Sequence, residues 1–127
     1  MDTAILWYGI GAVLLFLLLR RFMRMRSLTQ YSPAEVESRQ KSTDAPLLLD
    51  VRTDAERSSG SIRGSIHIPL GSLRARINEL EKYKSREIVC YCASGSRSAS
   101  AVLLLNKHGF RAGNLRGGIG EWNFAHR

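Results

Sequence analysis

The residues of this chain with the clearest chemical potential stand together in one loop, residues 92–97, of sequence CASGSR. The apolar stretch Ile88–Tyr91 precedes the loop, and a run of helix-forming residues, 98–105, follows it, a pattern typical of strand, tight polar loop and helix. Cys92 would then lie at the carboxyl end of a strand and at the entrance of a helix, where backbone N–H groups are unpaired and the helix dipole is positive. Such a position lowers the pKa of a thiol and makes the thiolate a nucleophile. We therefore predict that Cys92 is catalytic, the alternative being a buried inert thiol.

The rest of the loop is suited to binding an anion. Gly95 allows the loop to curl with a positive φ, and Arg97 adds a fixed positive charge. Arg52 follows a second predicted strand, so it could face the same crevice, although such an arginine is more often the partner of a nearby acid. The predicted substrate-binding residues are Ala93, Ser94, Gly95, Ser96, Arg97 and Arg52.

Length, charge and cysteine content limit the class of protein. The 127 residues suffice for one ordinary domain and an appendage, and the formal charge of +8 raises the question of nucleic acid. However, the basic residues either follow an apolar run or alternate with acids, which argues against a phosphate-binding track. Two cysteines are too few for a disulfide scaffold, and we expect Cys90 and Cys92 to face opposite sides of a strand, unpaired. Cys90 would serve core packing rather than resolve a disulfide. The three histidines lie far apart in the sequence, so no metal site and no cofactor are expected.

An uncharged N-terminal segment, residues 3–19, precedes four arginines at positions 20, 21, 24 and 26. A helix of that length spans about 25 Å, which is adequate for a bilayer if the arginines extend to the headgroups. A buried core helix would show a polar stripe, and a cleaved signal peptide would have basic residues in front and small residues behind. Neither is present, so we predict a retained membrane anchor. The arginine asymmetry predicts an external N-terminus and a cytoplasmic remainder.

The elements that must position the loop alternate between strands and helices. Residues 27–31 read as a polar connector, and Ser32 caps a helix that has Pro33 at its first position and Glu35 placed for a capping box. Strands are predicted at 47–51, 66–68, 88–91 and 110–115, and helical stretches at 55–58, 72–83, 97–107 and near the C-terminus. Such alternation favours an α/β class with a mainly parallel sheet, in which ligands bind at the carboxyl ends of the strands.

Four separated segments of the chain resemble the single-domain rhodanese (sulfurtransferase) family. They are Asp50-Val51-Arg52 with Glu56, residues 60–69, the loop C-x-x-G-x-R at 92–97, and Leu115-Arg116-Gly117-Gly118-Ile119 with Trp122. Ser61 and Ser65 depart from the usual His and Ala, which affects packing rather than chemistry. The resemblance covers residues 32–127, and it implies a five-stranded parallel sheet with helices on both faces. It also implies transfer of sulfane sulfur as a persulfide on Cys92, from a donor such as thiosulfate to a thiol or cyanide acceptor.

The resulting organisation is an anchor with its basic flank at 1–26, a linker at 27–31 and a rhodanese-like domain at 32–127. This arrangement is similar to the membrane-anchored bacterial rhodaneses, which implies a single-pass protein of the bacterial inner membrane. Two other function classes remain open. A phosphatase or arsenate reductase would have the wider loop C-x5-R, whereas residues 92–97 form C-x4-R, which suits a single sulfur atom. The other is a tethered docking module, with a membrane protein as partner.

Overall fold

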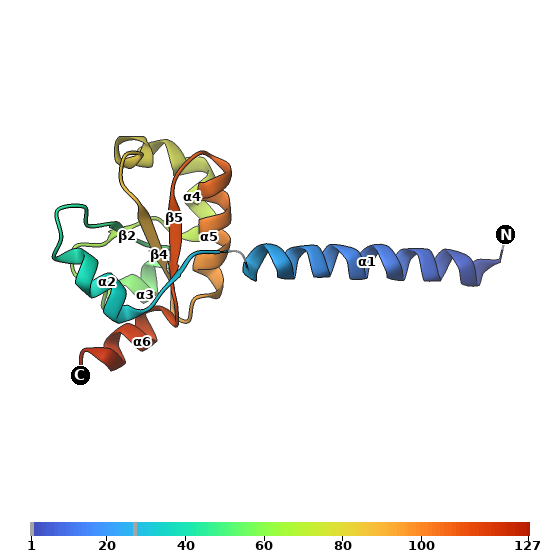
Figure 1. Ribbon diagram of the computed structural model, residues 1–127, viewed down its shortest axis with the longest axis horizontal. Coiled ribbons are helices and arrows are strands. Elements are labelled where there is room, and N and C mark those ends of the chain that lie inside the picture. Colours follow the sequence, from blue (N-terminus) through green and yellow to red (C-terminus); the bar gives the residue numbers. More distant parts are fainter. Residues whose placement is uncertain (1, 27) are drawn as a thin grey trace.

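The computed structural model describes residues 2–26 and 28–127, and its centre is a parallel sheet. Over these residues the sheet has five strands in the order β1-β5-β4-β2-β3 (Figure 1). Every neighbouring pair of strands is parallel. Their bounds are β1 Gln30–Tyr31, β2 Leu47–Asp50, β3 Ile66–His67, β4 Ile88–Tyr91 and β5 Ala112–Leu115. The carboxyl ends of β2 and β4 are therefore adjacent at one edge of the sheet, as the α/β interpretation predicts.

Helices cover both faces of this sheet (Figure 1). One face carries α4, the 3-10 helix η1 and α5, whereas α2 and α6 lie on the other. Their bounds are α2 Pro33–Gln40, α3 Asp54–Ser58, α4 Leu70–Arg76, η1 Ile77–Tyr83, α5 Ser96–Lys107 and α6 Gly118–Ala125. The predicted fold class, a five-stranded parallel sheet between helices, is confirmed.

Each central strand is buried on both faces because it has a helical layer on either side. In β2, Leu47 and Leu49 belong to the core under α4 and α5, while Leu48 belongs to the core under α2 and α6. The same alternation in β4 separates Ile88 and Cys90 from Val89 and Tyr91. This explains why both strands read as continuous apolar runs.

Most predicted helix boundaries agree with the structure, and one predicted connector does not. The Ser32 hydroxyl accepts a hydrogen bond from the Glu35 amide at 3.2 Å, with Pro33 in the first turn of α2, as expected of a cap. The interpretation of residues 27–31 as a polar linker was wrong for Gln30 and Tyr31, which form the edge strand β1 beside β5. A two-residue strand is too short to carry an alternating pattern, so its pairing comes from tertiary contacts alone. The part of the linker at Ser27 lies outside the described residues.

The N-terminal helix α1, Thr3–Arg26, extends away from the domain (Figure 1). Residues Thr3–Arg24 have a mean hydropathy of 1.9 and none of this span is buried against the rest of the chain. It is the one helix among the described residues that is long and apolar enough to cross a membrane. Length and composition are equally compatible with a signal sequence at this end of the chain.

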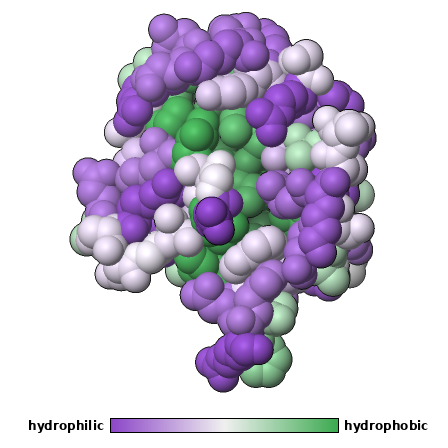
Figure 2. Space-filling view, turned by 90° about the vertical axis from the view of Figure 1, so that its left-hand side faces the viewer, coloured by the Kyte–Doolittle hydropathy of each residue, from purple (hydrophilic) through white to green (hydrophobic). Residues whose placement is uncertain are grey.

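The face of the domain remote from α1 carries a hollow of about 230 Å³ between α2, α6 and the loop after α3. Leu48, Ile62 and Trp122 contribute its apolar lining, and charged side chains such as Glu37 and Arg63 surround them. Figure 2, which views the molecule from this side, shows apolar surface at the bottom of a hollow with a hydrophilic rim. The hollow is separate from the loop that contains Cys92.

Candidate active site

The loop that follows β4 folds as a tight turn into α5. Gly95 has φ +108 and is the N-terminal cap residue of α5, which begins at Ser96. A residue with a side chain is strained at this φ, so the prediction that Gly95 curls the loop with a positive φ is confirmed. The turn brings the amides of Ser94, Gly95 and Ser98 towards the side chain of Cys92, the first residue after β4.

Hydrogen-bond donors surround the sulfur of Cys92. The Gly95 amide donates to Sγ at 3.1 Å, and the Ser98 hydroxyl lies 3.4 Å from Sγ. Burial by itself raises the pKa of the Cys92 thiol, but the Ser98 hydroxyl and the amides of Ser98, Gly95 and Ser94 lower it by more. The pKa of the Cys92 thiol therefore lies below its ordinary value. This environment favours the thiolate, which is the nucleophilic form of cysteine.

The second cysteine lies on the same side of the sheet without this environment. Cys90 and Cys92 belong to one core cluster, under α4 and α5, and both are free thiols. The expectation that they face opposite sides was wrong, because a strand alternates with a period of two and positions i and i+2 share a face. Burial raises the pKa of the Cys90 thiol well above its ordinary value, and the neighbouring Cys92 sulfur raises it further.

Cys92 has no exposed area in this structure, whereas its loop is open to solvent. Ala93, Ser94 and Ser96 are exposed, and Gly95 and Arg97 are half-buried. Because the Cys92 side chain is fully buried, we expect that a donor reaches the sulfur when this loop moves. The loop thus has two tasks, which are to cover the thiol and to hold its charge.

The first turn of α6 fixes the base of the loop. The amides of Ile119 and Gly120 donate to the carbonyl oxygens of Cys92 and Ala93, at 2.9 and 3.2 Å. Gly118 has φ +61, and a Cβ atom there would lie 2.4 Å from the Cys92 carbonyl oxygen. Gly117 also has a positive φ, +76, so the glycine pair forms a turn that brings α6 against the loop. The signal for these contacts in the sequence is the Gly117-Gly118 pair itself.

Arg97 joins the loop to the segment after β2. Its Nη1 and Nη2 donate to the two carboxylate oxygens of Glu56, at 2.6 and 2.8 Å. This contact lowers the pKa of Glu56 to about 2 and raises that of Arg97. Glu56 also completes a capping box with Thr53 at the start of α3. Arg97 therefore braces the loop, and Glu56 compensates the charge that Arg97 would otherwise offer to an anion.

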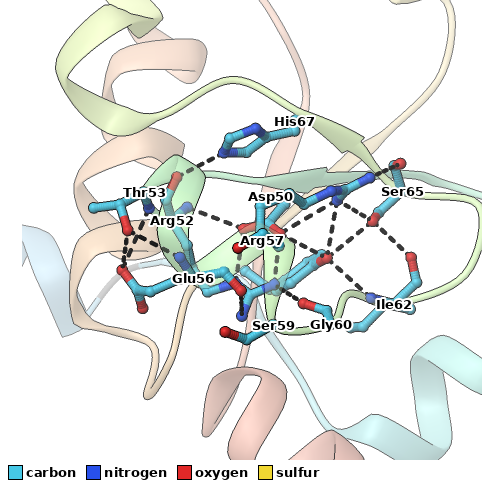
Figure 3. A network of polar contacts seen from close by, with 12 residues as sticks. Asp50, Arg52, Thr53, Glu56, Arg57, Ser59, Gly60, Ile62, Ser65 and His67 are labelled. Atoms are coloured by element: carbon cyan, nitrogen blue, oxygen red, sulfur yellow. Dashed lines mark hydrogen bonds and ion pairs between the residues drawn. The ribbon is translucent and has the colours of Figure 1, made fainter.

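Arg52 lies inside a network of internal hydrogen bonds beneath α3 (Figure 3). It donates from Nε and Nη2 to the carboxylate of Asp50, at 3.0 and 2.8 Å, and from Nη2 to the Gly60 carbonyl at 2.6 Å. Asp50 also accepts from Arg57 and from the Tyr91 hydroxyl. Arg52 is 5% exposed, so the geometry favours the structural role that the sequence left open, and its contact with substrate stays a prediction.

The sequence reasoning overlooked two buried polar side chains at the site. Ser98 is 0% exposed and Asn114, on β5, is 2% exposed. The Ser98 hydroxyl lies 2.5 Å from Asn114 Oδ1, while Asn114 Nδ2 donates to the Gly95 carbonyl at 3.1 Å. The sequence offered one signal for this pair, a serine within an apolar helical stretch and an asparagine in a short strand. Buried polar side chains need hydrogen-bond partners, so two such residues are candidates for a pair.

Comparison with known proteins agrees with this geometry. The rhodanese-like domain family matches residues 32–125. A sulfurtransferase of Allochromatium vinosum is 41% identical over 81 residues, which cover 63% of this chain and 74% of that protein. The Bacillus subtilis protein YtwF is 32% identical over 95 residues, which cover 75% of this chain and 90% of that protein.

Solved structures with a similar fold include other rhodanese-related proteins. A rhodanese-related protein from Thermoplasma volcanium superposes with a TM-score of 0.70 at 34% identity, over 76% of this chain and 92% of that one. The family match spans strands β2 to β5 of the sheet, the loop at Cys92 and the α6 turn that holds it, and it begins after the edge strand β1. On these grounds, the chain belongs to the rhodanese-like domain family.

Proposed function

We propose that this protein is a sulfurtransferase that carries sulfane sulfur as a persulfide on Cys92. The observation that carries the proposal is the set of donors around Sγ, the Ser94, Gly95 and Ser98 amides with the Ser98 hydroxyl, which favours an anionic sulfur. Membership of the family and the similarity to a sulfurtransferase support sulfur transfer as the class of reaction. The loop backbone from Ala93 to Arg97 would stabilise negative charge on sulfur throughout the cycle.

In the first half-reaction the Cys92 thiolate attacks the outer sulfur of a donor such as thiosulfate. A bond forms between Sγ and that sulfur, the sulfur–sulfur bond of the donor breaks, and sulfite leaves with the bonding electron pair. The negative charge then resides on the outer sulfur of the persulfide. The mechanism invokes no general base, because the donors around Sγ lower the pKa of Cys92 and so favour the thiolate.

In the second half-reaction an acceptor removes the outer sulfur. A thiolate or cyanide attacks it, the new bond to the acceptor forms, and the bond to Sγ breaks. The electron pair returns to Cys92 as thiolate, so that the protein is ready for another donor. The acceptor leaves as a persulfide or as thiocyanate.

The charge at the site bears on the choice of donor. Because Arg97 is already paired with Glu56, it adds little net attraction for a doubly charged donor. Thiosulfate therefore serves here as a test donor. A persulfide donor would transfer its outer sulfur to Cys92 and onward to the acceptor by the same two half-reactions.

Intact-mass spectrometry after incubation with thiosulfate tests the proposal. We expect one added sulfur atom that cyanide removes, and its loss in Cys92→Ser. Cys90→Ala is the matched control, because Cys90 is buried on the same face without donors to its sulfur among the described residues, and it should load normally. Absence of loading from thiosulfate and from a persulfide donor would refute sulfur transfer.

Phosphatase or arsenate chemistry is the nearest enzymatic alternative. The six-residue loop is one residue shorter than C-x5-R, and its amides already close on a single sulfur atom. Hydrolysis of an aryl phosphate by the protein, with no cyanide-removable sulfur on Cys92, would favour this alternative.

We further propose that α1 anchors the domain to the bacterial inner membrane, with the domain on the cytoplasmic side. The unburied apolar span Thr3–Arg24 and the arginines that follow residue 19 support this orientation. Carbonate washing of membranes should leave the full chain in the pellet. A shortened chain that lacks the α1 mass would instead indicate a cleaved signal sequence.

A docking role is the second candidate function, supported by the apolar hollow near Trp122. Detergent pull-down with Cys92→Ser distinguishes the two functions. Retention of a membrane-protein partner together with an unchanged growth phenotype would favour docking over catalysis.

A further inference from the structure

The Ser98 hydroxyl lies within hydrogen-bonding reach of the Cys92 sulfur, and it is held between two acceptors. Its hydroxyl oxygen lies 3.4 Å from Cys92 Sγ and 2.5 Å from Asn114 Oδ1. A hydroxyl carries a single proton, so it donates to one of these atoms at a time. The contact with Asn114 Oδ1 is the shorter of the two, as expected of a hydroxyl that donates to Asn114 in this geometry.

The orientation of Asn114 is fixed by its other contacts. Its Nδ2 donates to the Gly95 carbonyl and to Gln30 Oε1, each at 3.1 Å. Two acceptors on the nitrogen leave Oδ1 turned towards Ser98. Asn114 is therefore a permanent acceptor beside the reacting sulfur, joined through Gly95 to the same loop that supplies the amide donor.

We propose that the Ser98 hydroxyl is a catalytic group with two positions, donating to Asn114 when the Cys92 sulfur is neutral and to that sulfur when it is anionic. Asn114 is the positioning residue that holds the hydroxyl in reach while the charge is elsewhere. This inference deepens the proposed sulfur transfer and rests on it.

The sulfur alternates between these two states during one cycle. In the resting thiolate Sγ is anionic, so the Ser98 hydroxyl donates to it. After the bond to the outer sulfur forms, the charge lies on that outer atom, Sγ is neutral, and the Ser98 proton returns to Asn114. When the acceptor attacks, the bond between Sγ and the outer sulfur breaks and its electron pair goes to Sγ, which the Ser98 hydroxyl then stabilises as the leaving group. No proton is exchanged with solvent in this rotation.

The substitutions at Ser98 described below leave the other charged or titratable groups near Cys92 Sγ unchanged. They are Arg97 of α5, which lies close enough to interact with Cys92, and Cys90 of β4, with Glu56 of α3 behind Arg97. A change in the ionisation of Cys92 on removal of the Ser98 hydroxyl thus reports on that hydroxyl.

The pH dependence of Cys92 alkylation by iodoacetamide, measured on the full chain in detergent, tests the first part of the proposal. A hydrogen bond to a charged group predicts that Ser98→Ala raises the midpoint by roughly one pH unit, a tenfold change in the ionisation constant. Ser100→Ala is the matched control, since Ser100 is exposed on the same helix. An unchanged midpoint in folded Ser98→Ala would overturn the proposal.

A second pair of variants covers the case in which Ser98→Ala fails to fold. Ser98→Thr and Ser98→Val have the same shape and differ only in the hydroxyl. We expect Thr to keep the natural midpoint and Val to raise it, and equal midpoints would overturn the proposal. Because alkylation needs no sulfur donor, this result is independent of whether sulfur transfer occurs.

Single-turnover kinetics test the second part. Protein loaded with sulfur should release it to cyanide several-fold more slowly in Ser98→Ala, whereas loading above the alkylation midpoint should keep its rate. A loss of stability alone would slow both steps alike. Equal slowing of loading and release would therefore reduce Ser98 to a packing residue.

Discussion

Cys90 and Cys92 lie two residues apart, face the same layer of helices and are both inaccessible to solvent. Their thiols nevertheless shift in opposite directions, because burial raises the pKa of Cys90 whereas hydrogen bonds outweigh burial at Cys92. The structural difference is the end of the strand. Within β4 the backbone amides bond to β2 and β5, while beyond Tyr91 the loop directs its amides at a side chain. The difference in pKa between the two thiols thus comes from hydrogen-bond donors, the Ser98 hydroxyl and the loop amides, since both thiols are buried.

Substitution of each cysteine in turn should give the largest difference in sulfur loading between the two positions. Cys92→Ser is expected to abolish sulfur loading, since a hydroxyl at this position forms no persulfide. Cys90→Ala should retain loading and lose about 1 kcal/mol of unfolding free energy, a usual value for a small core change. Loading assays together with denaturant unfolding measure both effects. Substantial loss of activity in folded Cys90→Ala would show that the two cysteines act together.

A methyl group at Gly118 should displace the backbone of Cys92 and Ala93, where the strand environment of Cys90 gives way to the loop environment of Cys92. Its Cβ would meet the Cys92 carbonyl oxygen at 2.4 Å and strain a φ of +61. We expect Gly118→Ala to lose about 1–3 kcal/mol of unfolding free energy and at least tenfold in activity. Gly71→Ala is the matched control, because Gly71 lies in α4 with no atom within 4 Å of the added Cβ. There the change should be neutral or slightly stabilising, since alanine favours a helix.

The pH dependence of alkylation should separate the thiols within one molecule. Hydrogen-bond donors favour ionisation of the Cys92 thiol. The alkylation rate of Cys92 should therefore rise with pH with a midpoint below the usual cysteine value of about 8.5. Cys90 should stay unmodified over the same range, because its pKa is raised and its sulfur is covered. Peptide mapping after timed alkylation measures both rates. A small reagent should modify Cys92 faster than a bulky maleimide, because the loop has to move first. Equal rates for both reagents would contradict the covered position of the sulfur.

The smallest effect is expected where the loop joins α3. The pKa of Glu56 is depressed to about 2 by Arg97, so its stabilising contribution is present above an unfolded pKa near 4.5. That contribution is lost as the pH falls from about 4.5 towards 2. Glu56→Gln should therefore be less stable than the natural chain near neutral pH, with the difference shrinking in acid. Unfolding free energies at several pH values measure this, and Glu79→Gln, in an exposed pair with Arg76, is the control.

Short-range patterns in the sequence were enough to predict many of the secondary-structure elements and the loop at Cys92. The apolar runs at β2 and β4, the cap at Ser32 and the glycine at 95 each express a short-range rule, and the structure places them as predicted. The Cys92 loop was found in the same way, because strand, turn and helix are adjacent in the chain.

What the tertiary structure decided concerns contacts between distant segments. Gln30 and Tyr31 become a strand only beside β5, and Arg97 meets Glu56 across 41 positions. Ser98, in α5 beside the Cys92 thiol, has its partner Asn114 on the strand β5. Such pairings depend on the order of strands in the sheet, which no local pattern contains. The sequence therefore determined which cysteine stands between a strand and a helix, while the packing of the strands determined which groups control its charge.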